Sequence, residues 1–258
     1  MIARVVAVLA VAACSGKPRP EEVTSGVAAP SDATPAGDGA TAGDAEGARL
    51  ATGDLQIRVE WPDVPVAARR SPGRTPCNTP RTPSVAPTTT WGVPEALVIV
   101  DGAAPALDAA RITLADCTLT PRIAVGGSLA ITSAVDHPAK LVLRKRGSVA
   151  TLGQLVAGDP ILVLLPIAGH TVTTALDPGA IYSLETDAAD PEVAFVAAIA
   201  AGTLTDPSGE VIARGLLAGP HAVTAWLPPR AGQPGRTGHG TTTVAGGDLA
   251  ELTVTLAP

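Results

Sequence analysis

The side chains of this chain that could do chemistry are few, and most of them lie between residues 136 and 190. Asp136 and His137 are adjacent at the end of a predicted strand. Imidazole and carboxylate groups are the ligands of a hard nitrogen and oxygen site for zinc or oxidised copper. Such a site would combine His137 with neighbours from this stretch, namely Asp136, His170, Asp187 and Asp190. The alternative is that His137 is a hydrogen-bonded structural residue at a strand end, in which case no cofactor is bound.

No complete catalytic constellation accompanies these residues. The patterns GxSxG, HExxH, GxxxxGK and CxxC do not occur in the sequence. His239 lies in the glycine-rich stretch 235–240, which we expect to be a loop between strands and therefore no phosphate cradle. His221 belongs to a predicted strand and is expected to face solvent, and Asp206 is explained by a turn. The sequence therefore predicts a protein that is not an enzyme.

The elements that must position these residues are short strands. Alternating apolar residues in the stretch 111–143 predict three of them, at Ile112 and Leu114, at Ile123 and Val125, and at Leu129 and Ile131. Gly126-Gly127 turns the chain before the third strand, which leads to Asp136-His137. We expect this stretch to form one connected piece of an antiparallel β-sandwich.

Composition favours an all-β fold and excludes nucleic acid as a partner. Aromatic residues make up 2% of the 258 residues, so Val, Leu, Ile and Ala must supply the core, and 27 Gly with 25 Pro favour many short strands. The formal net charge of −6 provides no basic field for phosphate backbones. The densest basic cluster, Arg144-Lys145-Arg146, is expected to be a solvated hairpin turn.

The remaining chain is also predicted as strands and turns. Leu55, Ile57, Val59 and Trp61 alternate with polar residues and mark a half-buried strand. Residues 62–94 are expected to form a long surface excursion, and residues 95–100 a central strand. Later strands are predicted over these ranges: 141–143, 161–165, 172–176, 181–184, 210–214, 221–227 and 249–256. We therefore expect one sandwich over residues 51–193 and a small β-domain over residues 194–258.

The N-terminal residues predict export. Arg4 precedes the apolar stretch Val5–Ala13, which is too short to span a bilayer of about 30 Å. Val11-Ala12-Ala13-Cys14 resembles the lipobox of bacterial lipoproteins, and this resemblance implies a signal peptide at 1–13 and a lipid on Cys14. The alternative is an ordinary signal peptide with an incidental cysteine. Ser15, in place of the aspartate that retains lipoproteins of this class at the inner membrane, favours the outer membrane.

A disordered linker and a disulfide follow from this reading. Residues 14–50 are rich in Gly, Ala, Pro, Ser, Thr and acidic residues and have no apolar face to bury, so we expect a flexible tether. If Cys14 carries a lipid, Cys77 and Cys117 remain as a pair, which an oxidising compartment would join. Cys77 would then fasten the surface excursion to the body. The alternative is two free buried thiols.

Taken together, the motifs resemble bacterial exported proteins with a plastocyanin-like (cupredoxin) domain followed by a small carboxypeptidase-regulatory-like β-sandwich. The resemblance covers about residues 54–256. It rests on Leu114-Ala-Asp-Cys117 with Pro121, Val125-Gly-Gly-Ser-Leu129, Asp136-His137, Pro178-Gly-Ala-Ile-Tyr182, Leu204-Thr-Asp-Pro-Ser-Gly209, Gly219 and Ala225-Trp226. It implies a Greek-key β-sandwich over 51–193.

The copper ligands that this family would supply are missing from the sequence. A blue-copper site needs a cysteine thiolate, two imidazoles and a long axial sulfur. Thr186 stands where the cysteine would be, Asp190 stands near the histidine position, and no methionine follows. The resemblance therefore implies the fold without electron transfer.

We accordingly expect a non-enzymatic, lipid-anchored β-sandwich protein of the cell envelope that acts as a binding or structural module. Its expected partners are the membrane, through the lipid on Cys14, and an unknown envelope protein or glycan. One alternative is a copper- or zinc-binding or electron-transfer protein. The other is a carbohydrate- or peptide-binding accessory protein with an exposed aromatic side chain, Trp91 or Trp226, in a groove.

Overall fold

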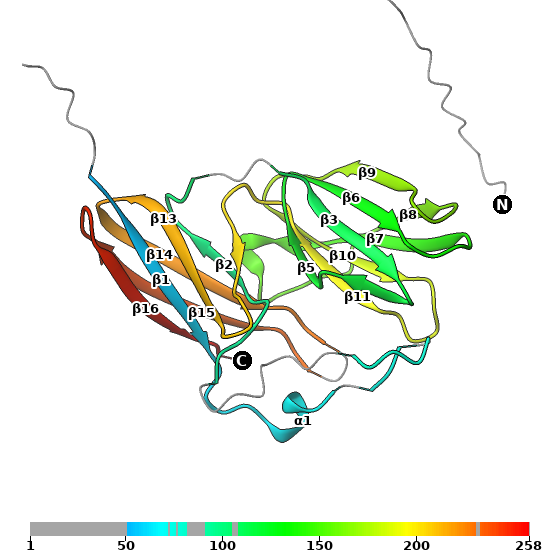
Figure 1. Cartoon of the computed structure of the whole chain (residues 1–258), viewed down its shortest axis with the longest axis horizontal. Helices are drawn as coiled ribbons and strands as arrows, with labels where there is room; N and C mark the ends of the chain where they lie inside the picture. The colour runs from blue at the N-terminus through cyan, green and yellow to red at the C-terminus, as the bar shows by residue number, and fades with distance from the viewer. Residues whose placement is uncertain are drawn as a thin grey trace, which may run out of the picture. The chain divides into compact units, whose positions relative to one another are not determined.

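The computed structural model describes residues 51–71, 73–75, 77–81, 91–104, 108–230 and 233–257 (Figure 1). The predicted signal peptide 1–13, the lipidation of Cys14 and the linker 14–50 lie outside these residues. Within the described part, sixteen strands account for most of the regular structure, so the predicted all-β, sandwich-type class is confirmed. The α-helix α1 spans only Val66–Arg69. None of the helices described is long and apolar enough to cross a membrane.

The first group of strands comes from two separate parts of the chain, and we call it the split sandwich (Figure 1). One sheet has the order β13 (Glu210–Leu217), β1 (Thr52–Glu60), β16 (Leu249–Thr255). The other has the order β12 (Thr203–Leu204), β2 (Leu97–Val100), β14 (Gly219–Leu227), β15 (Arg236–Val244). The central strand β1 is antiparallel to β13 and parallel to β16.

The second group is continuous in the chain, and we call it the inserted sandwich (Figure 1). One sheet has the order β4 (Thr118–Thr120), β3 (Ala110–Ala115), β6 (Ser128–Ser133), β9 (Thr171–Ala175). The other has the order β5 (Ile123–Val125), β11 (Val193–Ala197), β10 (Ala180–Thr186), β7 (Ala139–Ser148), β8 (Pro160–Leu165). A 3-10 turn, η1 (Val149–Thr151), follows β7.

Strand pairing differs from the expected division at residues 193 and 194. Strands β1 and β2 were assigned to the first sandwich, yet they pair with β13, β16, β12 and β14 near the C-terminus. Strand β11 contains the beginning of the expected C-terminal domain, yet it pairs with β10 and β5. The physical reason is that alternation identifies a strand and its buried face, but it carries no information about which distant strand will complete the sheet.

Three apolar cores hold the sheets together. Leu55, Ile57 and Val59 of β1 are fully buried in the core of the split sandwich, and a second core lies between the sheets of the inserted sandwich. The third core joins Leu97 and Trp226 of the split sandwich to residues of β5, β10 and β11. Strand β14 contributes to two cores because its alternate side chains point to opposite faces of its sheet.

Several local expectations have clear outcomes. The turn before β13 is confirmed, because Gly209 has φ +88° and Asp206 Oδ1 accepts hydrogen bonds from the backbone N–H of Ser208 and Glu210. The glycine-rich stretch around His239 is not a loop but part of β15. Arg144-Lys145-Arg146 is not a turn but lies within β7. In the last two cases the segment is polar and has no apolar alternation. It is a strand because its backbone pairs with a neighbouring strand.

Candidate functional site

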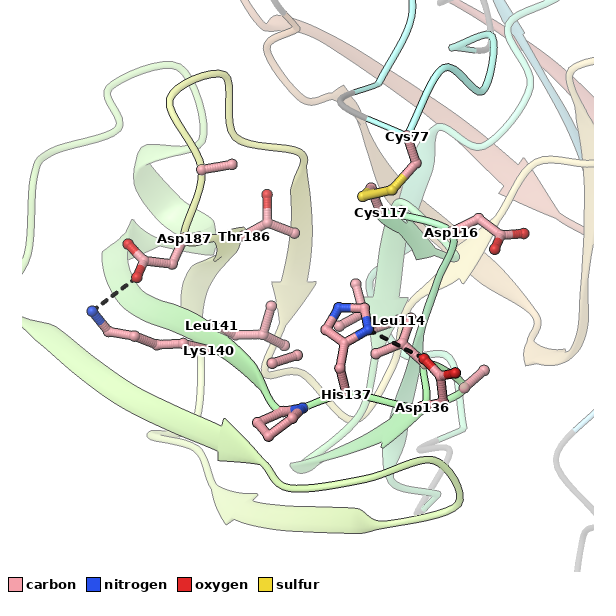
Figure 2. A pocket seen from close by; sticks show the side chains of 15 residues that line it. Cys77, Leu114, Asp116, Cys117, Asp136, His137, Lys140, Leu141, Thr186 and Asp187 are labelled. Carbon is pink, nitrogen blue, oxygen red and sulfur yellow. Dashed lines mark hydrogen bonds and ion pairs between the residues drawn. A yellow bond between two sulfur atoms is a disulfide. The ribbon is translucent and has the colours of Figure 1, made fainter.

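A cleft opens at one end of the inserted sandwich, and it has a volume of about 680 Å³ (Figure 2). Three connections at the same end of the sheets form its wall: the β3–β4 turn, the β6–β7 connection and the β10–β11 connection. Cys77, from the excursion after β1, completes the wall. The cleft therefore depends on the loops that leave the strands rather than on the strand faces.

The lining of the cleft is apolar inside and charged at its rim. Leu114 and Leu141 are 4% and 1% exposed, and both belong to the core of the inserted sandwich. The polar members of the lining are Asp116, Asp136, His137, Lys140, Thr186 and Asp187. The lining contains three aspartates and one lysine, so it carries a formal charge of −2 when His137 is neutral.

The disulfide fixes one wall of the cleft. Cys77 and Cys117 are joined, with their Cα atoms 5.6 Å apart, so the predicted pairing is confirmed and two free thiols are excluded. Asp116 and Cys117 form the two-residue turn between β3 and β4, and their φ angles are +45° and +60°. A two-residue hairpin turn of this hand requires positive φ at both positions, where residues with a Cβ are strained. The bond to Cys77 holds this turn beside the cleft.

The structure places His137 and Asp136 at the cleft but leaves them open to solvent. His137 Nδ1 lies 3.3 Å from Asp136 Oδ1, and the two side chains are 71% and 100% exposed. In Figure 2 the imidazole lies to the right of the Lys140–Asp187 ion pair and below the disulfide. His137 therefore contacts its neighbour Asp136, and most of its ring is open to solvent.

The other residues of the predicted metal set are not brought together with His137. Asp187 lines the cleft but lies 2.9 Å from Lys140 Nζ, which neutralises it. Asp190 pairs instead with Arg81 at 3.1 Å, and His170 does not line the cleft. Within the described ranges, no three His, Cys, Asp or Glu side chains gather closely enough to hold a metal ion.

Thr186 stands at the position that the copper-binding resemblance assigns to a cysteine. It lines the same cleft as His137, so the two positions lie at the same end of the sandwich. Its hydroxyl accepts a hydrogen bond of 2.9 Å from the backbone N–H of Glu192. Thr186 therefore links the two ends of the β10–β11 connection. This role is structural and involves no metal.

Two further expectations about single residues are wrong. His221 does not face solvent: it is 7% exposed, and each ring nitrogen lies 2.7 Å from a carbonyl oxygen, of Asp101 and of Leu217. Trp226 is fully buried in the third core, so it lines no groove. Trp91 is half-buried, and the guanidinium of Arg69 lies 4.1 Å from its ring centroid, which leaves that face covered.

Part of the cleft is predictable from the sequence. Asp136 and His137 follow a predicted strand, and Asp187 belongs to the stretch that the copper-binding resemblance aligns with ligand positions. Asp116 was noticed only as the neighbour of a cysteine, and Lys140 was not singled out at all. Lys140 is three residues after His137 at the start of β7, and that proximity is the signal that could have identified it.

Comparison with known proteins adds no family to this description. Neither the models of known protein families, nor the curated proteins, nor the solved structures include a match to this chain. The functional conclusion therefore depends on the residues of the cleft and on their geometry.

Proposed function

We propose that this chain is a non-enzymatic binding module of the bacterial cell envelope, tethered through a lipid on Cys14, and that its cleft receives a positively charged peptide segment of an envelope protein. The observation that carries the proposal is the cleft itself. Its volume of about 680 Å³ lies within the roughly 300–1,000 Å³ range of ligand sites, and it combines apolar walls with a few polar groups.

Charge is the reason for choosing a cationic ligand. The lining has three aspartates and one lysine, and the Asp136 carboxylate is fully exposed beside His137. A ligand with a lysine or arginine side chain would bring its charge to this rim, while its apolar atoms would contact Leu114 and Leu141. A glycan is less suited to the site, because Trp226 is buried and offers no stacking surface.

The disulfide supports a binding role for the same cleft. Cys117 fixes the β3–β4 turn, and Cys77 belongs to the lining as well. A wall that is covalently held before the ligand arrives loses less conformational freedom on binding. This arrangement favours recognition over a purely structural role.

We also propose that the inserted sandwich is a plastocyanin-like domain without its copper ligands, and that the C-terminal strands derive from a carboxypeptidase-regulatory-like domain. In support, His137 and Thr186 lie at one cleft, which is where the resemblance expects ligand positions to meet. Outer-membrane placement, implied by Ser15 after Cys14, belongs to the same proposal. Replacing Cys14 by serine should move the protein from the membrane fraction to the soluble fraction.

The binding proposal is tested with the full chain and a panel of short peptides that differ only in lysine against glutamine. Fluorescence anisotropy should show saturable binding of the lysine peptides and weaker binding of the glutamine peptides. Asp136→Asn should weaken binding about threefold, and Lys140→Gln should strengthen it by a similar factor, because it removes the one cation of the lining. Asp248→Asn, at an exposed position of the split sandwich, is the matched control.

Asp136→Asn and Lys140→Gln should change the peptide affinity in opposite directions. A general loss of folding would instead lower the affinity in both variants. If neither peptide series binds, or if Asp136→Asn and Lys140→Gln act in the same direction, the proposal is wrong. Stoichiometric binding of copper or zinc that His137→Ala abolishes would instead establish the metal-binding alternative.

A further inference from the structure

A second cavity lies beside the third core and is lined by four arginines. Its volume is about 240 Å³. The arginines are Arg81 after the disulfide-linked segment, Arg122 before β5, Arg146 in β7 and Arg230 after β14. Phe195 of β11 forms part of the wall and contacts Trp226 of the third core edge to face. Segments far apart in the sequence therefore place four cations around one small space.

Within the lining, carboxylates are fewer than these cations. The lining contains two, Glu185 and Glu192, so four guanidinium groups against two carboxylates leave a formal charge of +2. Glu192 pairs with Arg81 at 2.8 Å, and Glu185 lies 3.7 Å from Arg144, which is outside the lining. Two acids outside the lining offset part of the excess, since Asp190 pairs with Arg81 at 3.1 Å and Glu95 lies 4.0 Å from Arg122.

Two buried guanidinium nitrogens of the lining have no hydrogen-bond partner among the residues that the structure describes. They are Nη2 of Arg81 and Nε of Arg146, and the side chain of Arg81 is only 10% exposed. A buried N–H group that is left without an acceptor costs about 1–3 kcal/mol, and more when the group is charged. Most buried polar atoms in folded proteins are satisfied, so an acceptor placed beside these two nitrogens would be stabilised.

The backbone of β7 directs Arg146 to this position. Ile181 pairs with Gly147 and Tyr182 pairs with Lys145, so Arg146 is the extra residue of a β-bulge. Bulges re-aim side chains and recur beside binding and catalytic sites. The Arg146 carbonyl accepts a hydrogen bond of 2.8 Å from Val156 N–H, which holds the bulge.

Electrostatics agree with the geometry. Burial lowers the pKa of Arg122. Burial and, to a lesser extent, the charge of Arg122 lower the pKa of Arg230 to about 9. The pKa of Arg230 remains above 7, so the guanidinium stays protonated at neutral pH. An anion in the cavity would offset the cost of burying Arg122 and Arg230 and would reduce the repulsion between their charges.

We propose that this cavity is a binding site for a tetrahedral oxyanion of the phosphate or sulfate type. Guanidinium groups present paired N–H donors that match the oxygens of such anions. The volume of about 240 Å³ is smaller than the range of sites for drug-sized ligands, which favours a compact anion or a terminal phosphate group. The site is separate from the cleft around His137, because the two linings share no residue.

Calorimetric titration of the full chain with sodium phosphate and with sodium sulfate, at pH 7 and at an ionic strength fixed with sodium chloride, tests the proposal. We expect saturable binding with a stoichiometry of one. Arg122→Gln and Arg146→Gln should each weaken it at least tenfold. Arg214→Gln should leave it unchanged, since Arg214 is an exposed arginine of β13 outside this lining. Succinate, as a dicarboxylate, should bind more weakly than either tetrahedral anion.

Thermal unfolding provides a second test. A purely structural role of Arg146 would not make the unfolding temperature depend on phosphate. Without added anion at low ionic strength, Arg146→Gln should unfold at a temperature no lower than the unsubstituted chain, because it removes a buried N–H group that has no acceptor among the described residues. Phosphate should raise the unfolding temperature of the unsubstituted chain and not that of Arg146→Gln. Loss of stability in Arg146→Gln with no effect of phosphate on either protein would overturn the proposal. Binding of succinate in the absence of phosphate or sulfate binding would do the same.

Discussion

The rings of Phe195 and Trp226 meet edge to face, with their centroids 5.5 Å apart and their planes at 84°. Phe195 belongs to β11 of the inserted sandwich, and Trp226 belongs to β14 of the split sandwich. This pair is the centre of the third core, which holds strands from both sandwiches.

Trp226→Ala should therefore reduce the free energy of unfolding by about 3–5 kcal/mol, because it removes a fully buried indole and leaves a cavity. Trp91→Ala should cost less, since Trp91 is only half-buried. Urea denaturation followed by circular dichroism measures both. Equal losses for the two variants would show that the third core is not a principal source of stability.

The disulfide should contribute about 4 kcal/mol to stability, since Cys77 and Cys117 are separated by 40 residues. The Cys77→Ser/Cys117→Ser variant should show this loss in urea denaturation under oxidising conditions. In the Cys77→Ser background, Cys117→Gly should be more stable than Cys117→Ser by about 1 kcal/mol, because glycine adopts the φ of +60° without strain. A serine variant as stable as the glycine variant would indicate that the turn rearranges once the bond is lost.

Two aspartates provide a prediction about pH. The pKa of Asp177 is lowered by a hydrogen bond of 2.8 Å from Lys145, by the charge of Lys145 and by the Tyr182 hydroxyl. The pKa of Asp206 is lowered by hydrogen bonds from the Ser208 hydroxyl and from backbone N–H groups. Because the folded pKa lies below the unfolded value of about 3.9, each ionised carboxylate stabilises the fold above that pH. The contribution is lost as the pH falls through the folded pKa.

Carboxyl chemical shifts measured by NMR during an acid titration should separate the two sites. Lys145→Gln should raise the pKa of Asp177 toward its usual value and leave that of Asp206 unchanged. Ser208→Ala should raise the pKa of Asp206 and leave that of Asp177 unchanged. A shift of both groups in either variant would mean that the fold, and not the local contact, had changed.

The pairing of β1 and β2 with C-terminal strands predicts that residues 194–258 do not fold alone. Such a fragment lacks the central strand of one sheet, β1, and strand β2 between β12 and β14 in the other. Its circular dichroism spectrum should be that of an unfolded chain. A fragment with a cooperative thermal transition would contradict the strand pairing described here.

The sequence predicts single strands well and their partners poorly. Leu55, Ile57 and Val59 alternate with polar residues, and this pattern gives both the strand and its buried face. The partners of β1 begin at Glu210 and Leu249, and no local pattern encodes such a distant pairing. The apolar run Pro160–Leu165 shows the same limit, since it is an edge strand and Leu164 is 61% exposed.

The candidate sites differ in how far the sequence predicts them. The cleft was partly predictable, because Asp136, His137 and Asp187 follow strands whose ends meet at one edge of the sandwich. The arginine cavity was not predictable. Its four cations come from separate segments, and the position of Arg146 in the lining follows from a bulge in the β7–β10 pairing.

The parallel pairing of β1 with β16 has a consequence for the order in which the chain acquires its shape during synthesis. Leu55 pairs with Ala250, which is synthesised long after it. The inserted sandwich is complete once Ala197 has emerged, so it is free to fold while β1 remains an unpaired apolar strand. The nascent β1 strand must therefore be kept from pairing with other chains until β13 and β16 have been synthesised.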